Sequence, residues 1–400
     1  MTTLAPRNAA EVTDAVRWAI NAGEALEVAG AGTRRGLGRP VDAPHVLDVS
    51  GLRGVLEYEP EELILTALPG TPLAEIESLL AARKQCLMFE PPYLGGGLGT
   101  LGGAVSSGLS GPRRPKAGAV RDHVLGFTAV SGRGELFKAG GKVVKNVTGY
   151  DLPKLIVGSY GTLAVITELT IKVLPAQEDT RTLIVGGQAA AEAGRTMKTV
   201  LRSTADVSAA CYLPQGLSVP GVALHTPATA FRFEGVAPSV AFRLSRLREE
   251  LAAEGPMTVL NLDESLSFWR AVRDVAPFAD DPGRGLWRIS VPPALGVDVL
   301  GRIQAALPGS RAFLDWGGGL LWLQSAAADV STTLEVEQKI RSVLAESGGH
   351  ATLIRAPEEV RRSVNVFQPQ PASLAALSKR VKLQFDPKRV LNPGRMYADV

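Results

Sequence analysis

The feature that most constrains this chain is a pair of glycine-rich segments. Both lie within residues 1–176, and this part of the chain contains more than half of its 43 glycines. The first is Gly30-Ala31-Gly32-Thr33, directly after a strand predicted for residues 25–29. In the second, residues 95–111, most positions are Gly, Ser or Ala. Glycine adopts positive φ and lets another body approach the main chain closely. Because unobstructed N–H groups suit a phosphate, the pattern predicts a phosphate-containing ligand.

A nicotinamide-binding Rossmann loop is the main competing interpretation of the first segment. That loop reads Gly-x-Gly-x-x-Gly and opens a long helix. Here Arg35 occupies the sixth position, and Pro40 and Pro44 interrupt any helix that follows. A helix predicted for residues 8–22 also precedes the strand, whereas a Rossmann unit begins with its strand. The context disfavours NAD, and a plain glycine turn at either segment stays open as an alternative.

Charge and cysteine content exclude several other classes. The net charge is only +3, and the pairs Arg34-Arg35 and Arg113-Arg114 are too short for a nucleic-acid surface. Such a pair suits a solvated face or a single phosphate contact. Cys86 and Cys211 are far apart, so we expect neither a disulfide framework nor an iron–sulfur cluster, which normally takes four thiolates. This cysteine usage predicts a cytoplasmic setting.

Four hundred residues exceed what one core usually supports, so two lobes are expected. No apolar run reaches the ~18 residues of a membrane span, and the first six residues lack secretory features. The first lobe is predicted to end at residue 176. Helical and strand-like patterns then alternate through residues 177–380 in an α+β layout. Residues 381–400 form a C-terminal segment.

Local patterns predict how individual elements begin and end. Asn8 followed by Glu11 predicts a capped helix that stops at Gly23. Thr71 is predicted to cap a helix with Pro72 in its first position. Asp151 is predicted to cap a short helix. Residues 95–111 are predicted as an irregular loop.

Five segments resemble, in their order along the chain, the FAD domain of the vanillyl-alcohol-oxidase/PCMH superfamily of flavoproteins. They are Val28–Thr33, Pro69-Gly70, Gly99–Gly108, Arg121–Gly126 and Gly158–Leu163. Three more particular stretches resemble the FAD-binding E-subunit family of bacterial glycolate oxidases: Phe89–Pro92, Lys145–Asp151 and Leu391–Met396. The resemblance implies an α+β fold with a PCMH-type FAD-binding lobe of two subdomains. An α/β cap lobe would follow, and the C-terminal segment would return to the flavin.

The resemblance also implies which residues contact the cofactor. The pyrophosphate would lie against Gly30, Ala31, Gly32 and Thr33. The second side of the dinucleotide would be lined by Thr100, Gly102, Gly103, Ser107 and Gly108. The remaining contacts would come from Gly161, Val165 and Ile166 on the adenine or ribitol side, and from Asn392 at the flavin ring. Neither glycine segment contains a cysteine, and the only nearby histidine is His123, so non-covalent FAD is expected.

The catalytic residues stay unassigned. Hydride transfer from a 2-hydroxy acid to a flavin needs a base for the hydroxyl proton and a cation for the carboxylate. Related hydroxy-acid dehydrogenases carry a histidine-rich segment with a glutamate, whereas the four histidines here are isolated. No metal site is therefore expected. The candidates for the base or for anion contacts are His123, Lys145, Tyr150 and Arg395, each with a structural role as its alternative.

The implied function is that of the FAD-binding subunit of a glycolate oxidase (glycolate dehydrogenase) complex. Such a complex oxidises glycolate to glyoxylate and passes electrons to an iron–sulfur subunit. A larger paralogous FAD subunit would carry the histidine-rich segment. No nucleic acid and no transmembrane segment are expected, and the complex would place the chain at the inner face of the cell membrane. The alternatives are an autonomous FAD-dependent 2-hydroxy-acid (D-lactate-like) oxidoreductase and a structural subunit with a degraded flavin site.

Overall fold

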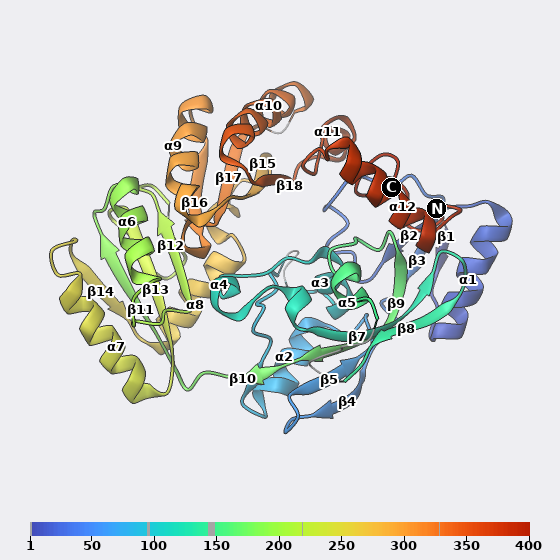
Figure 1. The fold of residues 1–400 in the computed structure, drawn as a ribbon, viewed down its shortest axis with the longest axis horizontal. Coiled ribbons are helices and arrows are strands. Elements are labelled where there is room, and N and C mark those ends of the chain that lie inside the picture. Colours follow the sequence, from blue (N-terminus) through green and yellow to red (C-terminus); the bar gives the residue numbers. More distant parts are fainter. Residues whose placement is uncertain (1, 94–96, 143–148, 218, 328) are drawn as a thin grey trace. The chain divides into compact units, whose positions relative to one another are not determined.

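The computed structural model describes residues 2–93, 97–142, 149–217, 219–327 and 329–400 (Figure 1). The chain divides into two compact units. The first unit contains Met1–Ser110, Gly118–Ala176 and Pro369–Val400, and the second contains Gly111–Ala117 and Gln177–Gln368. The sequence analysis places the last boundary after residue 380. In the structure, residues 369–380 belong with the C-terminal segment, because helix α12 (Ala372–Phe385) is continuous and its Phe385 packs against Phe137 of the first unit.

Three parallel strands form the smaller sheet of the first unit, in the order β1-β3-β2. They are β1 (Thr2–Leu4), β3 (His45–Asp48) and β2 (Leu26–Ala29). Helix α1 (Ala9–Ala22) connects β1 to β2. Asn8 Oδ1 accepts a hydrogen bond from Glu11 N at 2.9 Å, and Gly23 ends the helix with a φ of 72°. The predicted helix and both of its ends are confirmed.

The larger sheet of the first unit has five antiparallel strands, in the order β4-β5-β9-β7-β8. They are β4 (Val55–Glu59), β5 (Ile64–Ala67), β9 (Ala164–Lys172), β7 (Val124–Ser131) and β8 (Leu136–Gly140). A two-stranded ribbon pairs β6 (Gln85–Cys86) with β10 (Leu174–Pro175). The other helices of this unit are α2 (Leu73–Ala81), α3 (Leu101–Ser107), the short turn η1 (Val120–Asp122) and α5 (Leu152–Ile156).

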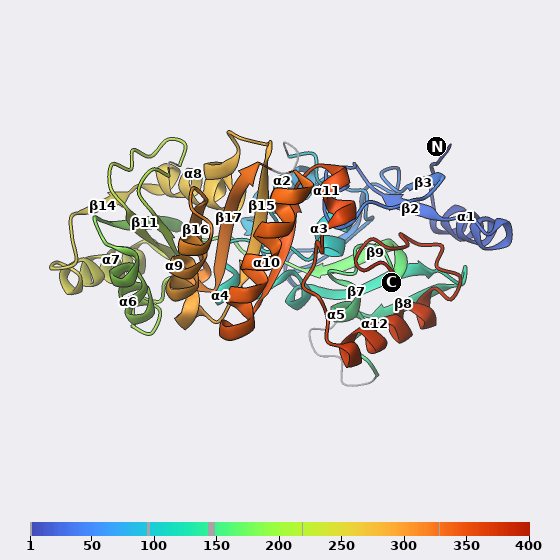
Figure 2. The ribbon, with the colours of Figure 1, turned by 90° about the horizontal axis from the view of Figure 1, so that it is seen from above.

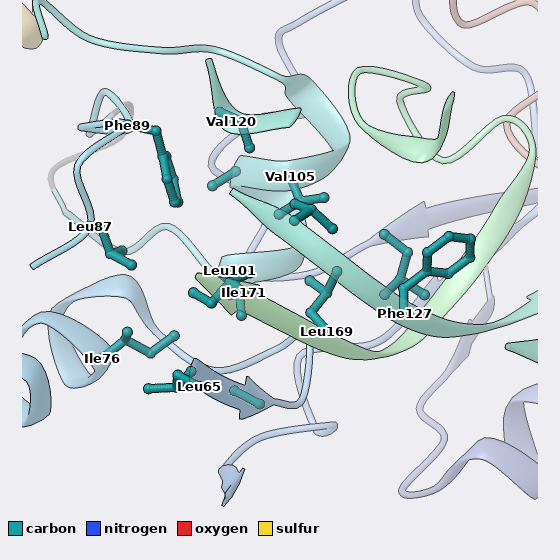
Figure 3. Close-up of a cluster of buried hydrophobic side chains, with 14 of the residues drawn as sticks. Leu65, Ile76, Leu87, Phe89, Leu101, Val105, Val120, Phe127, Leu169 and Ile171 are labelled. Atoms are coloured by element: carbon teal, nitrogen blue, oxygen red, sulfur yellow. The ribbon is translucent and has the colours of Figure 1, made fainter. Parts of the chain in front are cut away.

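A hydrophobic core joins the five-stranded sheet to helices α2 and α3 (Figure 3). Leu65 of β5 and Ile171 of β9 contribute from the sheet, and Ile76 contributes from α2. Helix α3 contributes Leu101 and Val105, both fully buried. Burial of these apolar side chains is the main force that fixes α3 against the sheet.

Helix α3 lies where the sequence analysis predicts an irregular loop, so that prediction is wrong. Glycine lowers helix propensity, but tertiary packing of an apolar face outweighs propensity in a short helix. Thr100 Oγ1 accepts a hydrogen bond from Gly103 N at 3.3 Å and so caps the first turn. Glycine is needed at position 102, since a Cβ there would lie 2.6 Å from Pro69 Cβ.

The cap predicted at Thr71 is also wrong, and the one predicted at Asp151 is confirmed in position only. Helix α2 begins at Leu73 with Pro72 in the capping position, and Thr71 precedes it. The Thr71 hydroxyl donates to Leu68 O at 2.7 Å and accepts from Gly54 N at 2.9 Å, so it serves the preceding turn. Asp151 occupies the N-cap position of α5, but its side chain makes no capping hydrogen bond, and its carboxylate pairs with Lys154.

The second unit is built on one antiparallel sheet of eight strands, in the order β14-β11-β13-β12-β16-β17-β15-β18. The strands are β11 (Asp179–Gly186), β12 (Ala209–Leu213), β13 (Ala228–Gly235), β14 (Met257–Leu260), β15 (Arg284–Ser290), β16 (Arg311–Asp315), β17 (Leu320–Ala327) and β18 (His350–Arg355). The helices are α4 (Arg114–Ala117), α6 (Ala190–Val200), α7 (Ala237–Glu250), α8 (Leu262–Arg273), α9 (Gly296–Ala306), α10 (Val330–Ser347) and α11 (Glu358–Ser363). The short turns are η2 (Ala276–Phe278), η3 (Pro293–Leu295) and η4 (Trp316–Gly318). Helices α9 and α10 lie side by side (Figure 2).

Helices cover both faces of this sheet. Successive residues of a strand face opposite sides, and β13 shows the consequence. Phe233 packs under the guanidinium of Arg243 from α7, with 5.9 Å between Cζ and the ring centre. Its neighbour Arg232 packs on the ring of Trp269 from α8. The unit is therefore an α+β domain, as the sequence pattern predicts.

The C-terminal segment returns to the first unit, as predicted. Leu391 forms a parallel bridge with Leu26 of β2, and Asn392 N donates to Leu26 O at 3.0 Å. In the described ranges, no helix combines the length and the apolar composition that crossing a bilayer requires.

Candidate functional site

A pocket in the first unit opens where β2 ends, beside α3, the start of β9 and the C-terminal segment. Its lining includes every predicted cofactor residue except Gly108: Gly30, Ala31, Gly32, Thr33, Thr100, Gly102, Gly103, Ser107, Gly161, Val165, Ile166 and Asn392. Arg34, Arg35, Tyr160 and Arg395 also line it. The two glycine-rich segments, separate in sequence, thus face one cavity.

The first wall of the pocket is the turn after β2. Gly30 passes close to Thr100, and a Cβ on Gly30 would lie 3.0 Å from Thr100 Oγ1. Gly32 has a φ of +75°, a conformation that other residues adopt only with strain. The glycines therefore allow both the turn and its close approach to α3.

The second wall is α3. Gly103 N donates to Thr100 Oγ1, and the Ser107 hydroxyl donates to Ala104 O at 3.2 Å. Gly108 does not line the pocket. It ends the helix with a φ of +64°, and a Cβ there would lie 3.1 Å from Gly158 Cα. Gly108 is a packing position, and the predicted cofactor contact is not placed there by the structure.

Asn392 joins the remaining walls. Its Oδ1 accepts from Val28 N at 2.8 Å, and its Nδ2 donates to Tyr160 O at 2.7 Å. A Cβ on Gly161 would lie 2.7 Å from this Nδ2. The side chain is buried, and both of its ends bind main chain. Asn392 therefore ties β2 to the turn before β9 and gives the pocket its shape.

Two of the three arginines at the pocket are held by Glu27. Arg35 Nε donates to Glu27 Oε1 at 2.9 Å, and Arg395 Nη1 lies 3.6 Å from the same oxygen. The hydrogen bond from Arg35 lowers the pKa of Glu27 despite its burial. Arg395 Nη2 also donates to Arg34 O at 3.0 Å and to Arg35 O at 3.1 Å. Arg395, a candidate anion contact, thus holds the turn in place.

Arg34 differs from its neighbours. Its Nη2 donates to Pro92 O at 3.0 Å, while Nε and Nη1 are buried and have no hydrogen-bond partner among the described residues. Burial lowers the pKa of Arg34 to about 10, so it remains a cation at neutral pH. Arg34 and Arg35 cannot be told apart in the sequence, since both belong to one basic pair.

The other catalytic candidates lie elsewhere. His123 is buried in the core, with its ring centre 5.5 Å from that of Phe89, and does not line the pocket. Tyr150 is 90% exposed and does not line it either. Lys145 lies outside the described residues. The described lining contains no His, Lys, Asp, Glu or Cys, and apart from the arginines its one titratable side chain is that of Tyr160, so this pocket offers mainly binding groups.

No group of three or more His, Cys, Asp or Glu side chains comes together as a metal site over the part of the chain that the structure describes. Cys211 is buried, and burial raises the pKa of its thiol well above the ordinary value. Such a thiol is unreactive.

Comparison with known proteins agrees with this geometry. A family model described as an FAD binding domain matches residues 2–140. The chain is 37% identical over 386 residues to the glycolate oxidase subunit GlcE of Escherichia coli (strain K12), covering 96% of both chains. It is 32% identical over 182 residues to the glycolate oxidase subunit GlcD of Bacillus subtilis (strain 168), covering 45% of this chain and 38% of that one.

Among solved structures, p-cresol methylhydroxylase shares the fold with a TM-score of 0.74 at 13% identity, covering 100% of this chain and 88% of the other. The shared fold is the α+β, PCMH-type arrangement expected from the sequence. The fold alone does not identify the family, but the near full-length match to GlcE does. The chain belongs to the family of the glycolate oxidase subunit GlcE, and with it to the FAD-linked oxidoreductases of 2-hydroxy acids.

Proposed function

We propose that the pocket of the first unit binds one FAD non-covalently, and that the chain serves as the FAD-binding subunit of a complex that oxidises glycolate to glyoxylate. The observation that carries this proposal is the pocket itself. Its walls are the bare main chain of Gly30–Thr33, the start of α3 and Gly161, with Arg34 beside them. Main-chain amides and a cation suit the diphosphate of a dinucleotide, and the lack of side chains leaves room for it.

The residues of each wall have separate tasks. Gly30, Ala31, Gly32 and Thr33 would donate main-chain N–H groups to the diphosphate from one side, and Gly102 and Gly103 would lie against it from the other. Val165 and Ile166 are buried at the start of β9 and would exclude water from an aromatic part of the ligand. Bound FAD supplies the hydride-accepting chemistry. The protein residues bind and orient it.

The pocket's composition supports a division of labour between subunits. Oxidation of a 2-hydroxy acid needs a base, and the described lining has no His, Lys, Asp, Glu or Cys to serve as one. We therefore assign the main oxidation step to a larger paralogous FAD subunit and electron transfer to an iron–sulfur subunit. The similarity to two different subunits of glycolate oxidase, GlcE and GlcD, supports this view. With only Cys86 and Cys211, the chain lacks the thiolates for a cluster of its own.

The proposed location follows from the proposed partners. The chain would work in the cytoplasm, at the inner face of the cell membrane, held there by the other subunits. No contact with nucleic acid is proposed, since the net charge is only +3.

The test is purification of the full chain, alone and with its native partners, followed by visible spectroscopy. Both preparations should be yellow, and acid should release the flavin intact because no covalent bond holds it. Glycolate should bleach the complex rapidly and the isolated chain slowly or not at all. Rapid bleaching of the isolated chain by glycolate or D-lactate would instead support the autonomous oxidase. A colourless chain that does not bind added FAD would support the alternative of a structural subunit with a degraded flavin site.

A further inference from the structure

The buried guanidinium of Arg34 has unused hydrogen-bonding capacity. An arginine carries five N–H donors and no acceptor. Only the bond from Nη2 to Pro92 O is formed among the described residues, and both Nε and Nη1 are shielded from solvent. Buried polar groups are nearly always hydrogen-bonded in native proteins. An unpartnered pair of donors on a cavity wall therefore points to a ligand that accepts from them.

The position of the guanidinium identifies which part of a ligand it can reach. Arg34 directly follows the turn Gly30–Thr33. Its Nη1 lies 3.6 Å from the point where a Cβ on Gly103 would stand and 2.7 Å from the corresponding point on Gly99. The absent side chains at these glycines leave the space that the guanidinium occupies. Arg34 thus lies where the two glycine-rich walls of the pocket meet.

The charge around Arg34 is also unbalanced. Arg35 and Arg395 share Glu27, whereas the titratable groups that face Arg34 are the phenols of Tyr93 and Tyr160. No described carboxylate pairs with it. Burying a cation without a counter-charge is unfavourable, because its lost hydration is not replaced. A ligand anion would remove this cost.

We propose that Arg34, which lines the pocket, binds the diphosphate of the dinucleotide, and so makes the pocket selective for FAD over riboflavin. This inference rests on the proposed function, because it takes the ligand of the pocket to be FAD. It adds the residue that recognises the anion. Two donors on one planar group match two phosphate oxygens, a geometry that lysine cannot reproduce.

The test compares the full chain, freed of flavin, with the variants Arg34→Gln and Arg34→Lys. Arg53→Gln is the matched control, since Arg53 is exposed and pairs with Glu75 away from the pocket. FAD, ADP and riboflavin are titrated into each protein by calorimetry. Arg34→Gln should weaken FAD and ADP roughly ten- to hundredfold, the value of one or two charge-assisted hydrogen bonds. Its affinity for riboflavin should stay within about twofold of the wild type. Arg34→Lys should fall between, and Arg53→Gln should match the wild type.

A stability measurement separates ligand binding from a structural role. Because the flavin-free protein keeps Arg34 as an unpaired buried cation, Arg34→Gln should leave the Tm of the flavin-free chain unchanged or raise it. A residue that only supports the fold would lower that Tm in both states. Arg34→Gln should reduce only the additional Tm increase that FAD produces.

Four results would overturn the inference. One is an unchanged affinity of Arg34→Gln for ADP, above all if the flavin midpoint potential falls, because Arg34 would then face the flavin ring. Another is a wild type that binds FAD but not ADP. The third is a wild-type chain that binds no FAD, which defeats the proposed function as well. Binding of FAD by the wild type with equal affinity in Arg34→Gln defeats this inference alone.

Discussion

Buried charge is arranged differently in the two units. In the second unit, the Glu234 carboxylate is 5% exposed and accepts from Arg113 Nε at 3.0 Å, with Arg232 Nε at 3.6 Å. Burial alone would raise the pKa of Glu234, but Arg232 and Arg113 outweigh it and hold this pKa at about 2. In the first unit, Arg34 has no such partner among the described residues. A neutralised ion group supports the fold, and an unneutralised one marks a place for a ligand.

The first unit also contains a neutralised group, which should give the largest effect when broken. Lys382 and Asp386 have fully buried side chains, and Lys382 Nζ donates to Asp386 Oδ2 at 2.8 Å, Thr162 O at 2.6 Å and Leu391 O at 2.8 Å. Lys382→Met should lower the free energy of unfolding by about 3–5 kcal/mol, since it leaves a buried carboxylate unpaired. It should also release the segment that carries Asn392 and weaken FAD binding. Urea denaturation and flavin retention measure both.

Lys379→Met is the matched control for this experiment. Lys379 lies on the same helix and is exposed, and its Nζ lies 3.8 Å from Asp399 Oδ2. Its replacement should change stability by less than about 0.5 kcal/mol. If Lys382→Met and Lys379→Met changed stability and flavin retention equally, the buried Lys382–Asp386 pair would not be what holds the C-terminal segment in place.

The next effect concerns the second unit. Glu234→Gln should cost about 3 kcal/mol of unfolding free energy, because Arg113 and Arg232 lose their counter-charge in a buried site. Glu249→Gln, on the exposed side of α7, should cost little. Urea denaturation of the full chain compares the two variants. If Glu234→Gln lost flavin while its unfolding free energy stayed unchanged, the buried charge of the second unit would not be serving the stability of the fold, contrary to our assignment.

The same group predicts a pH dependence. The folded pKa of Glu234, about 2, is lowered from an ordinary value of 4.5. Its stabilisation is therefore complete above pH 4.5 and is lost as the pH falls toward 2. The loss should approach about 3 kcal/mol in the wild type and be absent in Glu234→Gln. Unfolding free energies measured from pH 5.5 downward should show the two proteins converging; parallel curves would contradict the assignment.

The smallest effect concerns the shape of the pocket. Gly161→Ala should cost about 1–2 kcal/mol, because φ is +69° and the new Cβ would approach Asn392 Nδ2. The affinity for FAD should fall with it. Gly36→Ala is the control, since its Cβ would meet no atom within 4 Å. Thermal melts with and without FAD measure both; a Gly161→Ala chain that behaves like Gly36→Ala would remove Gly161 from the pocket wall.

The glycine turns of the first unit could be predicted because their requirements are local. A strand that enters Gly30-Ala31-Gly32-Thr33 must turn there, and few side chains obstruct its amides. Helix α3 could not be predicted in this way. Its formation depends on burial of Leu101 and Val105 in a core contributed by distant strands, which the local glycine content conceals. The predicted helix cap at Thr71 is wrong for a related reason, since the Thr71 hydroxyl accepts a hydrogen bond from Gly54 N.

The roles of charged residues were the least predictable. Arg34 and Arg35 are adjacent, and only the fold brings Glu27 to one and not to the other. Lys382 looks like any helical lysine in the sequence, yet it is buried against Thr162 and Leu391. Which charged side chains are neutralised depends on partners that are far away in the sequence. The periodicity of apolar residues does not reveal these partners.

The most direct test of the account is a titration of FAD into the flavin-free full chain, followed by quenching of flavin fluorescence and by the mass of the released cofactor. We expect saturation at one unmodified FAD per chain, with ADP competing for the same site. Correctly folded protein that leaves FAD free in solution, or that binds riboflavin as tightly as FAD, would contradict it.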